Sequence, residues 1–343
     1  MDSPARGKLF GSKFSFDDFA GACKRSGLAA LAALLVFQCA LPGEASVTKQ
    51  VVRIGDRQAA ISANVWCDPE APRRAILIGL HGGVQYGGNF TALGEKLAPQ
   101  GIAVYSLDLR GHGQCLIDSK QRPRLDYEQS TKDVVALTEH LRATNPKVPI
   151  FCVGESLGAS VALKAQAAKP KLFDGLILAS VGMRPVLSKH IGATLKNIGL
   201  GFGTLGSTID LTPHVRVISD DPRSCLEMID DPLCRKKLSV AEMLHALNYM
   251  HTAHCLVPHM DPDVPVLVIQ GLEDRIIHAS ATAALFEKLS SHDKSLVTFP
   301  ECGHLLVTTN FLKPNVVSTV QNWVFGHSND NPLALTAVKE VSD

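Results

Sequence analysis

A glycine-flanked serine, in the pattern GESLG at residues 154–158, is the feature of this sequence with the clearest chemical meaning. It follows the apolar run PIFCV and precedes the small-residue run ASVALKA. This order predicts a strand, an abrupt turn with Ser156 at its apex, and a helix. Glycines are needed on both sides because such a turn brings the strand and the helix close together. Ser156 is therefore the candidate nucleophile.

A serine hydroxyl is a weak nucleophile near neutral pH, so it needs a base and an acid that orients the base. Two late apolar runs lead into GLED, which ends at Asp274, and into ECGH, which ends at His304. The carboxyl ends of parallel strands share one sheet edge, so both side chains are expected near Ser156. We predict Asp274 as the acid, with Glu273 as its rival, and His304 as the base.

The oxyanion that forms during acyl transfer needs two fixed backbone donors. The N–H of Leu157, directly after the nucleophile, is one candidate. The other is the N–H of Gly83, in the HGG turn that follows the buried run RAILIGL. The nine cysteines include no C-x-x-C pair and no zinc-site spacing, and this chemistry needs neither a metal nor an organic cofactor.

Strand-like and helix-like runs alternate from about residue 75 onward, which predicts an α/β fold with a mostly parallel sheet. Residues 50–66 alternate around a Gly-Asp pair and predict an antiparallel hairpin at the sheet edge. The regularity stops between 183 and 261, so we interpret that segment as an inserted cap. The expected organisation is a leader (1–45), a core in two parts (46–182 and 262–327), the cap (183–261) and a tail (328–343).

Composition limits the function classes. The chain has 343 residues, 45% of them apolar, which suffices for a large buried core. Its net charge is +1 and it has no Lys and Arg run, so we expect no nucleic-acid partner. Cys225 and Cys234 are close enough in sequence for a disulfide if the protein is exported, and buried free thiols are the alternative.

The leader has the features of a secretory signal. Lys24 and Arg25 precede an apolar run at 27–41, and small residues before Ser46 predict cleavage after Ala45. The run is shorter than the about 20 apolar residues that span a bilayer. We therefore expect an exported or membrane-attached protein; an uncleaved anchor, a transit peptide and a cytosolic tail are the alternatives.

These motifs, together with LDLRGHGQ at 107–114, resemble those of α/β-hydrolases of the monoacylglycerol lipase and lysophospholipase group, the serine aminopeptidase-like family. Order and spacing agree over residues 74–325, and the acidic-proline segment SDDP resembles the cap of that group. The resemblance implies a central sheet with helices on both faces, an inserted cap and the same site. The implied triad is Ser156, Asp274 and His304, with Gly83 and Leu157 as oxyanion donors.

The resemblance also implies a serine hydrolase that cleaves carboxylic esters, above all lipid monoesters such as monoacylglycerols or lysophospholipids. Two features depart from the group: Glu155 stands where histidine is common, and residues 84–90 lack an acidic residue. An esterase, thioesterase or aminopeptidase, and a binding protein without turnover, are the alternatives. The GFGTLG segment at 201–206 matches a dinucleotide fingerprint without a βαβ unit, so we interpret it as an apolar cap segment that contacts a membrane surface or the acyl chain.

Overall fold

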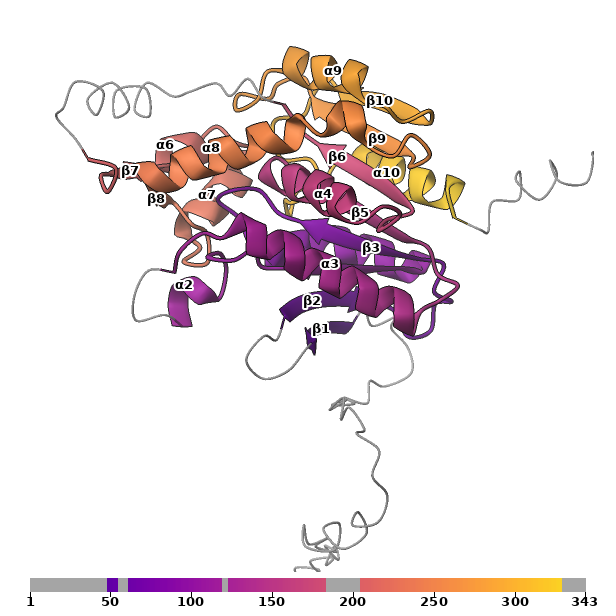
Figure 1. Cartoon of the computed structure of the whole chain (residues 1–343). Helices are drawn as coiled ribbons and strands as arrows, with labels where there is room; N and C mark the ends of the chain where they lie inside the picture. Colours follow the sequence, from indigo (N-terminus) through magenta and orange to yellow (C-terminus); the bar gives the residue numbers. More distant parts are fainter. Residues whose placement is uncertain (1–47, 55–60, 119–122, 183–203, 329–343) are drawn as a thin grey trace, which may run out of the picture. The chain divides into compact units, whose positions relative to one another are not determined.

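The structure, a computed structural model, describes residues 48–54, 61–118, 123–182 and 204–328 (Figure 1). All of them belong to one compact unit, Ala45–Asp343. The predicted leader at 1–45, the first part of the predicted cap at 183–203 and the tail from 329 lie outside the described residues.

Eight strands of the described chain form one sheet in the order β1-β2-β4-β3-β5-β6-β9-β10. The antiparallel pairs are β1 with β2 and β2 with β4, and every later neighbour is parallel. The mostly parallel sheet and the hairpin at its edge are therefore confirmed. The strands are β1 (Thr48–Ile54), β2 (Ile61–Cys67), β3 (Ala75–Leu80), β4 (Ile102–Leu107), β5 (Ile150–Glu155), β6 (Gly175–Ala179), β9 (Val266–Gly271) and β10 (Lys294–Phe299).

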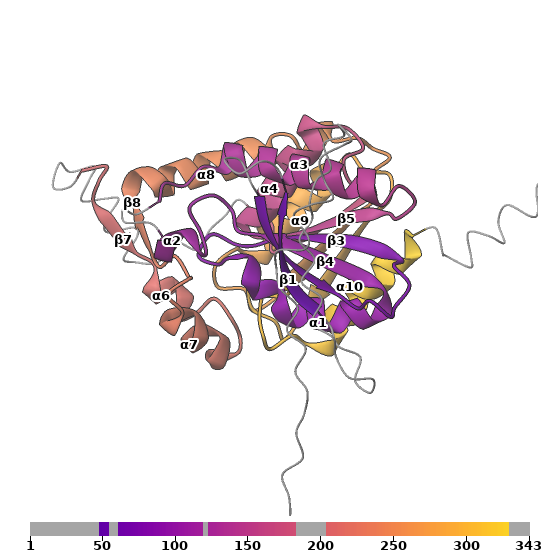
Figure 2. The same ribbon diagram turned by 90° about the horizontal axis from the view of Figure 1, so that it is seen from below.

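Helices cover both faces of this sheet (Figure 2). Successive residues of β3 belong to different apolar clusters, with Ile76 and Ile78 on one face and Leu77 on the other. A strand buried on both faces is apolar at every position, which is why these strands lack alternation in the sequence. One face packs against α3 (Tyr127–Thr144), α4 (Leu157–Ala168) and α9 (Ala279–Lys288), the other against α1 (Thr91–Leu97) and α10 (Pro314–Gly326).

The cap predicted at 183–261 lies between β6 and β9, and its residues 204–261 are described. Its longest helix, α8 (Val240–His254), packs against α4 of the core (Figure 1). Its other elements are short: β7 (Thr208–Asp210), α6 (Thr212–Val215), α7 (Pro222–Asp230), β8 (Lys237–Ser239) and the 3-10 turn η4 (Val257–His259). The remaining core elements are α2 (Cys115–Asp118), η2 (Gly87–Phe90) and η3 (Ala98–Gln100). The position where the cap begins stays a prediction.

A further prediction concerns two cysteines. Cys225 and Cys234 are both buried free thiols, so the structure corresponds to the second of the two alternatives. Burial raises the pKa of Cys234 to about 12, which keeps this thiol protonated and unreactive at neutral pH. Within the ranges that the structure describes, no helix is long and apolar enough to cross a membrane.

Candidate active site

Ser156 lies in a strained turn between β5 and α4. Its backbone has φ 58° and ψ −117°, a conformation that L-residues rarely adopt. A Cβ atom on Gly154 would lie 2.5 Å from the carbonyl oxygen of Gly158, and one on Gly158 would lie 2.0 Å from that of Leu80. Both clashes are with backbone atoms, so they could be relieved only by moving the helix away from the sheet. The glycines of the pattern are therefore needed for the close packing of α4 on the sheet, as the sequence predicts.

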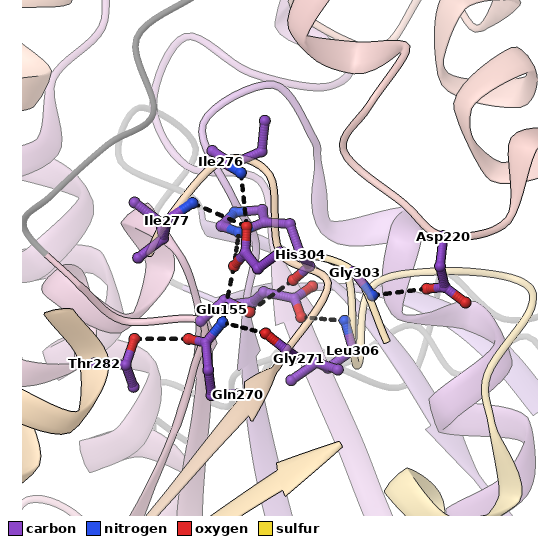
Figure 3. A network of polar contacts seen from close by, with 12 residues as sticks. Glu155, Asp220, Gln270, Gly271, Ile276, Ile277, Thr282, Gly303, His304 and Leu306 are labelled. Carbon is purple, nitrogen blue, oxygen red and sulfur yellow. Dashed lines mark hydrogen bonds and ion pairs between the residues drawn. The ribbon is translucent and has the colours of Figure 1, made fainter. Parts of the chain in front are cut away.

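His304 and Asp274 form a buried pair after β10 and β9. Nδ1 of His304 and Oδ2 of Asp274 are 2.8 Å apart, and their side chains are 2% and 0% exposed. The other oxygen, Oδ1, accepts the backbone N–H groups of Ile276 and Ile277 at 2.7 and 2.8 Å (Figure 3). The carboxylate is thereby fixed on both oxygens, and it can hold the imidazole ring in one orientation.

The pKa values of this pair move apart. Burial alone would raise the pKa of Asp274, but the charge and hydrogen bond of His304 and the two backbone donors outweigh it, so the pKa falls below its usual value. Burial alone would lower the pKa of His304, but the charge and hydrogen bond of Asp274 outweigh it and raise the pKa. Asp274 is therefore the charged partner at neutral pH, and His304 is a stronger base than a free histidine.

The rival residues lie away from this pair. Glu273 is exposed to solvent although it is adjacent to Asp274 in the sequence. His278 and His292, which lie between β9 and β10 and could be considered as alternative bases, are exposed as well. The structure thus brings Asp274, rather than Glu273, to His304.

The backbone around His304 is held by the core and by the cap. The hydroxyl of Ser180, just after β6, donates to the carbonyl of His304 at 2.7 Å. The N–H of His304 donates to the Ile218 carbonyl in the cap at 3.1 Å. The N–H of Gly303 donates to Asp220, also in the cap, at 2.9 Å (Figure 3). A displacement of the cap would therefore act directly on the segment that carries His304.

Two buried polar residues, Gln270 and Glu155, belong to the site although the motifs predict no role for them there. Gln270 donates to Oδ2 of Asp274 at 3.0 Å and accepts the Thr282 hydroxyl at 2.6 Å. Glu155 accepts the N–H groups that follow His304, as detailed below. A signal was present in both cases, because each is a polar residue at the end of an apolar strand, and a buried polar group needs partners.

One cavity opens onto all but one of the predicted site residues. It is lined by Ser156, by His304 and by both candidate oxyanion donors, Gly83 and Leu157, while Asp274 lies behind His304. Leu157 begins α4, and the first N–H groups of a helix have no acceptor within the helix, so its N–H is available to a ligand. The cap contributes an apolar wall formed by Leu211, Ile218, Leu238, Met243, Ala246, Leu247 and Met250.

A family model described as serine aminopeptidase, S33, matches residues 71–309, which include the whole site. The chain belongs to this family. The chain is similar to the mouse monoglyceride lipase, with 28% identity over 75% of this chain and 84% of the mouse protein. The monoacylglycerol lipase of Mycolicibacterium smegmatis is 23% identical over 77% of this chain and 92% of its own length.

Solved structures show the same fold at lower identity. The monoacylglycerol lipase of Paleococcus ferrophilus has a TM-score of 0.63 at 21% identity and covers 78% of this S33-family chain and 99% of its own. A soluble variant of the Saccharomyces cerevisiae monoglyceride lipase, in complex with a substrate analog, has a TM-score of 0.68 at 17% identity, with coverages of 85% and 100%. The resemblance and the α/β-hydrolase fold predicted from the motifs are thus confirmed.

Proposed function

We propose that this S33-family chain is a serine hydrolase that cleaves the carboxylic ester of a lipid monoester. The observation that carries the proposal is the cavity, in which Ser156 and His304 face an apolar wall supplied by the cap. An apolar wall suits an acyl chain, because burying hydrocarbon is the main source of its binding energy. Mouse and mycobacterial relatives named for monoglyceride or monoacylglycerol hydrolysis support the same substrate class.

The residues of the site divide the chemistry between them. His304 takes the proton of Ser156 as its oxygen attacks the ester carbonyl, and Asp274 stabilises the imidazolium that forms. The N–H groups of Gly83 and Leu157 bind the oxyanion. His304 then donates the proton to the leaving alcohol as the C–O bond breaks. A water molecule, deprotonated by His304, attacks the acyl-enzyme, releases the acid and restores Ser156.

The charge of the cavity favours a neutral alcohol group. Among the described residues, no Lys, Arg, Asp or Glu lines it. A lysophospholipid would bring a phosphate that needs a cationic or multidentate partner, and an aminopeptidase substrate would bring an ammonium that needs a carboxylate. A monoacylglycerol brings only hydroxyl groups. We therefore place monoacylglycerols before lysophospholipids, and both before peptides, thioesters and short esters.

A fluorophosphonate probe tests the enzyme claim. The probe should label the wild-type protein covalently, and Ser156→Ala should remove the label, because the probe reacts only with an activated serine. Circular dichroism should show both proteins folded. A folded wild type that takes up no label would defeat the hydrolase proposal and leave a binding protein.

A substrate panel tests the choice of substrate. We expect the highest kcat/KM with a long-chain monoacylglycerol, compared with the matching lysophospholipid, a thioester, a short ester and an aminopeptidase substrate. Each extra methylene buried in an apolar site contributes about 0.8 kcal/mol, so long-chain esters should exceed short ones. A preference for the aminopeptidase substrate would overturn the lipid assignment.

Contact between the cap and a lipid surface is part of this proposal. Four of the six large exposed apolar side chains in the described ranges lie in the cap: Leu205, Val217, Leu226 and Leu244. Leu205 belongs to the GFGTLG segment, which the sequence predicts to contact a membrane surface or the acyl chain, and it is 58% exposed. Leu205→Asp should weaken binding to phosphatidylcholine vesicles in a flotation assay, whereas Ile117→Asp, outside the cap, should not. Equal binding of both variants would remove the cap from the proposal.

Export or membrane attachment through the leader at 1–45 is likewise proposed. Its support is the apolar run followed by small residues. Sequencing the amino terminus of the protein from its native source should find Ser46 as the first residue. A retained leader in a membrane fraction would instead indicate an anchor, and a retained leader in a soluble fraction would contradict both.

A further inference from the structure

A buried polar network joins three segments of the site: the turn between β5 and α4, the segment after His304 and the HGG turn. Its side chains are Gln85, Glu155 and Thr308, which are 1%, 0% and 1% exposed. Only Gln85 also lines the cavity. Polar groups this deep in a protein are costly unless they are hydrogen-bonded, so their arrangement carries information about the site.

Glu155 ties the nucleophile to the segment after His304. It directly precedes Ser156, and its carboxyl group accepts the backbone N–H of Leu306 at 2.6 Å (Figure 3). The same group accepts the N–H groups of Val307 and Thr308 at 3.1 Å each. It also hydrogen-bonds the hydroxyl of Thr308. One side chain therefore fixes four groups of the histidine segment relative to the serine.

Gln85 fixes the HGG turn from two sides. Its backbone N–H donates to the carbonyl of Gly82 at 3.2 Å, which closes a turn with Gly83 inside it. Its side-chain oxygen accepts the N–H of Gly82 at 3.3 Å. Gly82 lies against the nucleophile, since a Cβ atom there would be 3.6 Å from Cβ of Ser156.

Thr308 connects these two parts. Its hydroxyl donates to Oε1 of Gln85 at 2.9 Å, and its carbonyl accepts Nε2 of the same side chain at 2.8 Å. The same hydroxyl contacts the Glu155 carboxyl, so it links the side chains of Gln85 and Glu155. Burial raises the pKa of Glu155, while the Thr308 hydroxyl and the backbone N–H groups act in the opposite direction.

We infer that Glu155, Thr308 and Gln85 form a positioning chain that sets the Gly82–Gly83 turn relative to Ser156 and His304, with the Thr308 hydroxyl as its central link. The inference rests on the proposed hydrolase function, and it assigns to these residues no contact with the reacting atoms. Two consecutive glycines leave the turn intrinsically free to move, whereas an oxyanion donor acts only when it is held at its distance in advance. The positioning chain supplies that restraint from outside the turn.

Thr308→Val tests the link, because valine keeps the shape of threonine and all backbone donors but lacks the hydroxyl. We expect kcat to fall about 10- to 100-fold, up to the effect of losing one oxyanion donor. KM should change less than about threefold, since the cavity wall is intact. Thr308→Ser restores the hydroxyl and should recover most of kcat.

The next residue in the sequence, Thr309, provides a matched control. Thr309 is also buried, but its hydroxyl bonds Ser224 of the cap at 2.6 Å and takes no part in the positioning chain. Thr309→Val should keep kcat within about threefold of wild type. A purely structural role of Thr308 would lower the melting temperature without the selective loss of kcat and without rescue by serine.

A second variant tests the positioning chain at Gln85. Gln85→Met should show the same fall in kcat. The double variant with Thr308→Val should be no slower than the slower single variant, because both substitutions break the same connection between Thr308 and Gln85. If Thr308→Val does not fold, Gln85→Met alone decides. An unlabelled, inactive wild type would defeat the hydrolase proposal itself. An active wild type with near-normal kcat in a folded Thr308→Val or Gln85→Met variant would overturn the positioning chain.

Discussion

Two buried carboxyl groups act on His304 from different sides. Asp274 bonds its imidazole ring, and Glu155 bonds the backbone that follows it. Their environments move their pKa values in opposite directions: charged and backbone donors outweigh burial at Asp274 and lower its pKa, while burial dominates at Glu155 and raises it. Environment therefore gives the two carboxyl groups different roles: Asp274 serves the base, and Glu155 positions the loop that follows it.

Asp274→Asn tests the charged role. The amide would no longer orient His304 in the tautomer that accepts the serine proton, so kcat should fall about 10³- to 10⁴-fold. The pKa of His304 is raised by Asp274, and only the neutral ring acts as base. Activity should therefore be lost as pH falls through this raised pKa, and the acidic limb of kcat/KM should move to lower pH in the variant.

Glu273→Gln is the control for this change, because Glu273 is the adjacent carboxylate and is exposed. Its pH profile and kcat should match those of the wild type. A steep loss in Glu273→Gln, with near-normal rates in Asp274→Asn, would transfer the role of the acid to Glu273.

At the scale of elements, the elbow depends on how closely α4 approaches β3. A Cβ atom on Gly158 would lie 2.0 Å from the carbonyl oxygen of Leu80, so Gly158→Ala must separate the helix from the sheet. We expect a loss of more than about 2 kcal/mol in the free energy of unfolding, seen by urea titration.

The control for this prediction is Gly326→Ala at the end of α10, where a Cβ atom would meet nothing within 4 Å. That change should be neutral within about 0.5 kcal/mol. An unchanged midpoint for Gly158→Ala would show that the helix can shift without cost, and the steric argument for the glycine would be wrong.

Local patterns explain why most of the core could be predicted from the sequence. Continuous apolar runs predicted the buried strands. The order of Ser156, Asp274 and His304, each after its own strand, predicted the pairing of Asp274 with His304 that the structure shows. The links through Glu155 and Gln85 could not be predicted, because they join residues 151 to 223 positions apart. Short cap elements with no clear period were missed for the same reason, since tertiary packing decides them.

At the scale of the whole unit, the cap both encloses the site and holds it. Ile218 and Asp220 bond the segment that carries His304, while α8 and β8 supply the apolar wall opposite Ser156. Substrate selection and the placement of the base therefore depend on one segment. Side chains on the inner face of α8 should control the length of the acyl chain, because they narrow or widen the cavity without touching the triad.

Ala246→Phe tests this at the wall. Ala246 lines the cavity and is buried, so a phenyl ring there must occupy space that an acyl chain would use. We expect kcat/KM for long-chain monoacylglycerols to fall at least about tenfold, while short-chain esters keep theirs within about threefold. Leu244→Phe, on the same helix but 44% exposed, should change neither. An equal loss on long and short esters would mean that the ring displaces the catalytic loops, and the acyl chain would then have to lie along another wall.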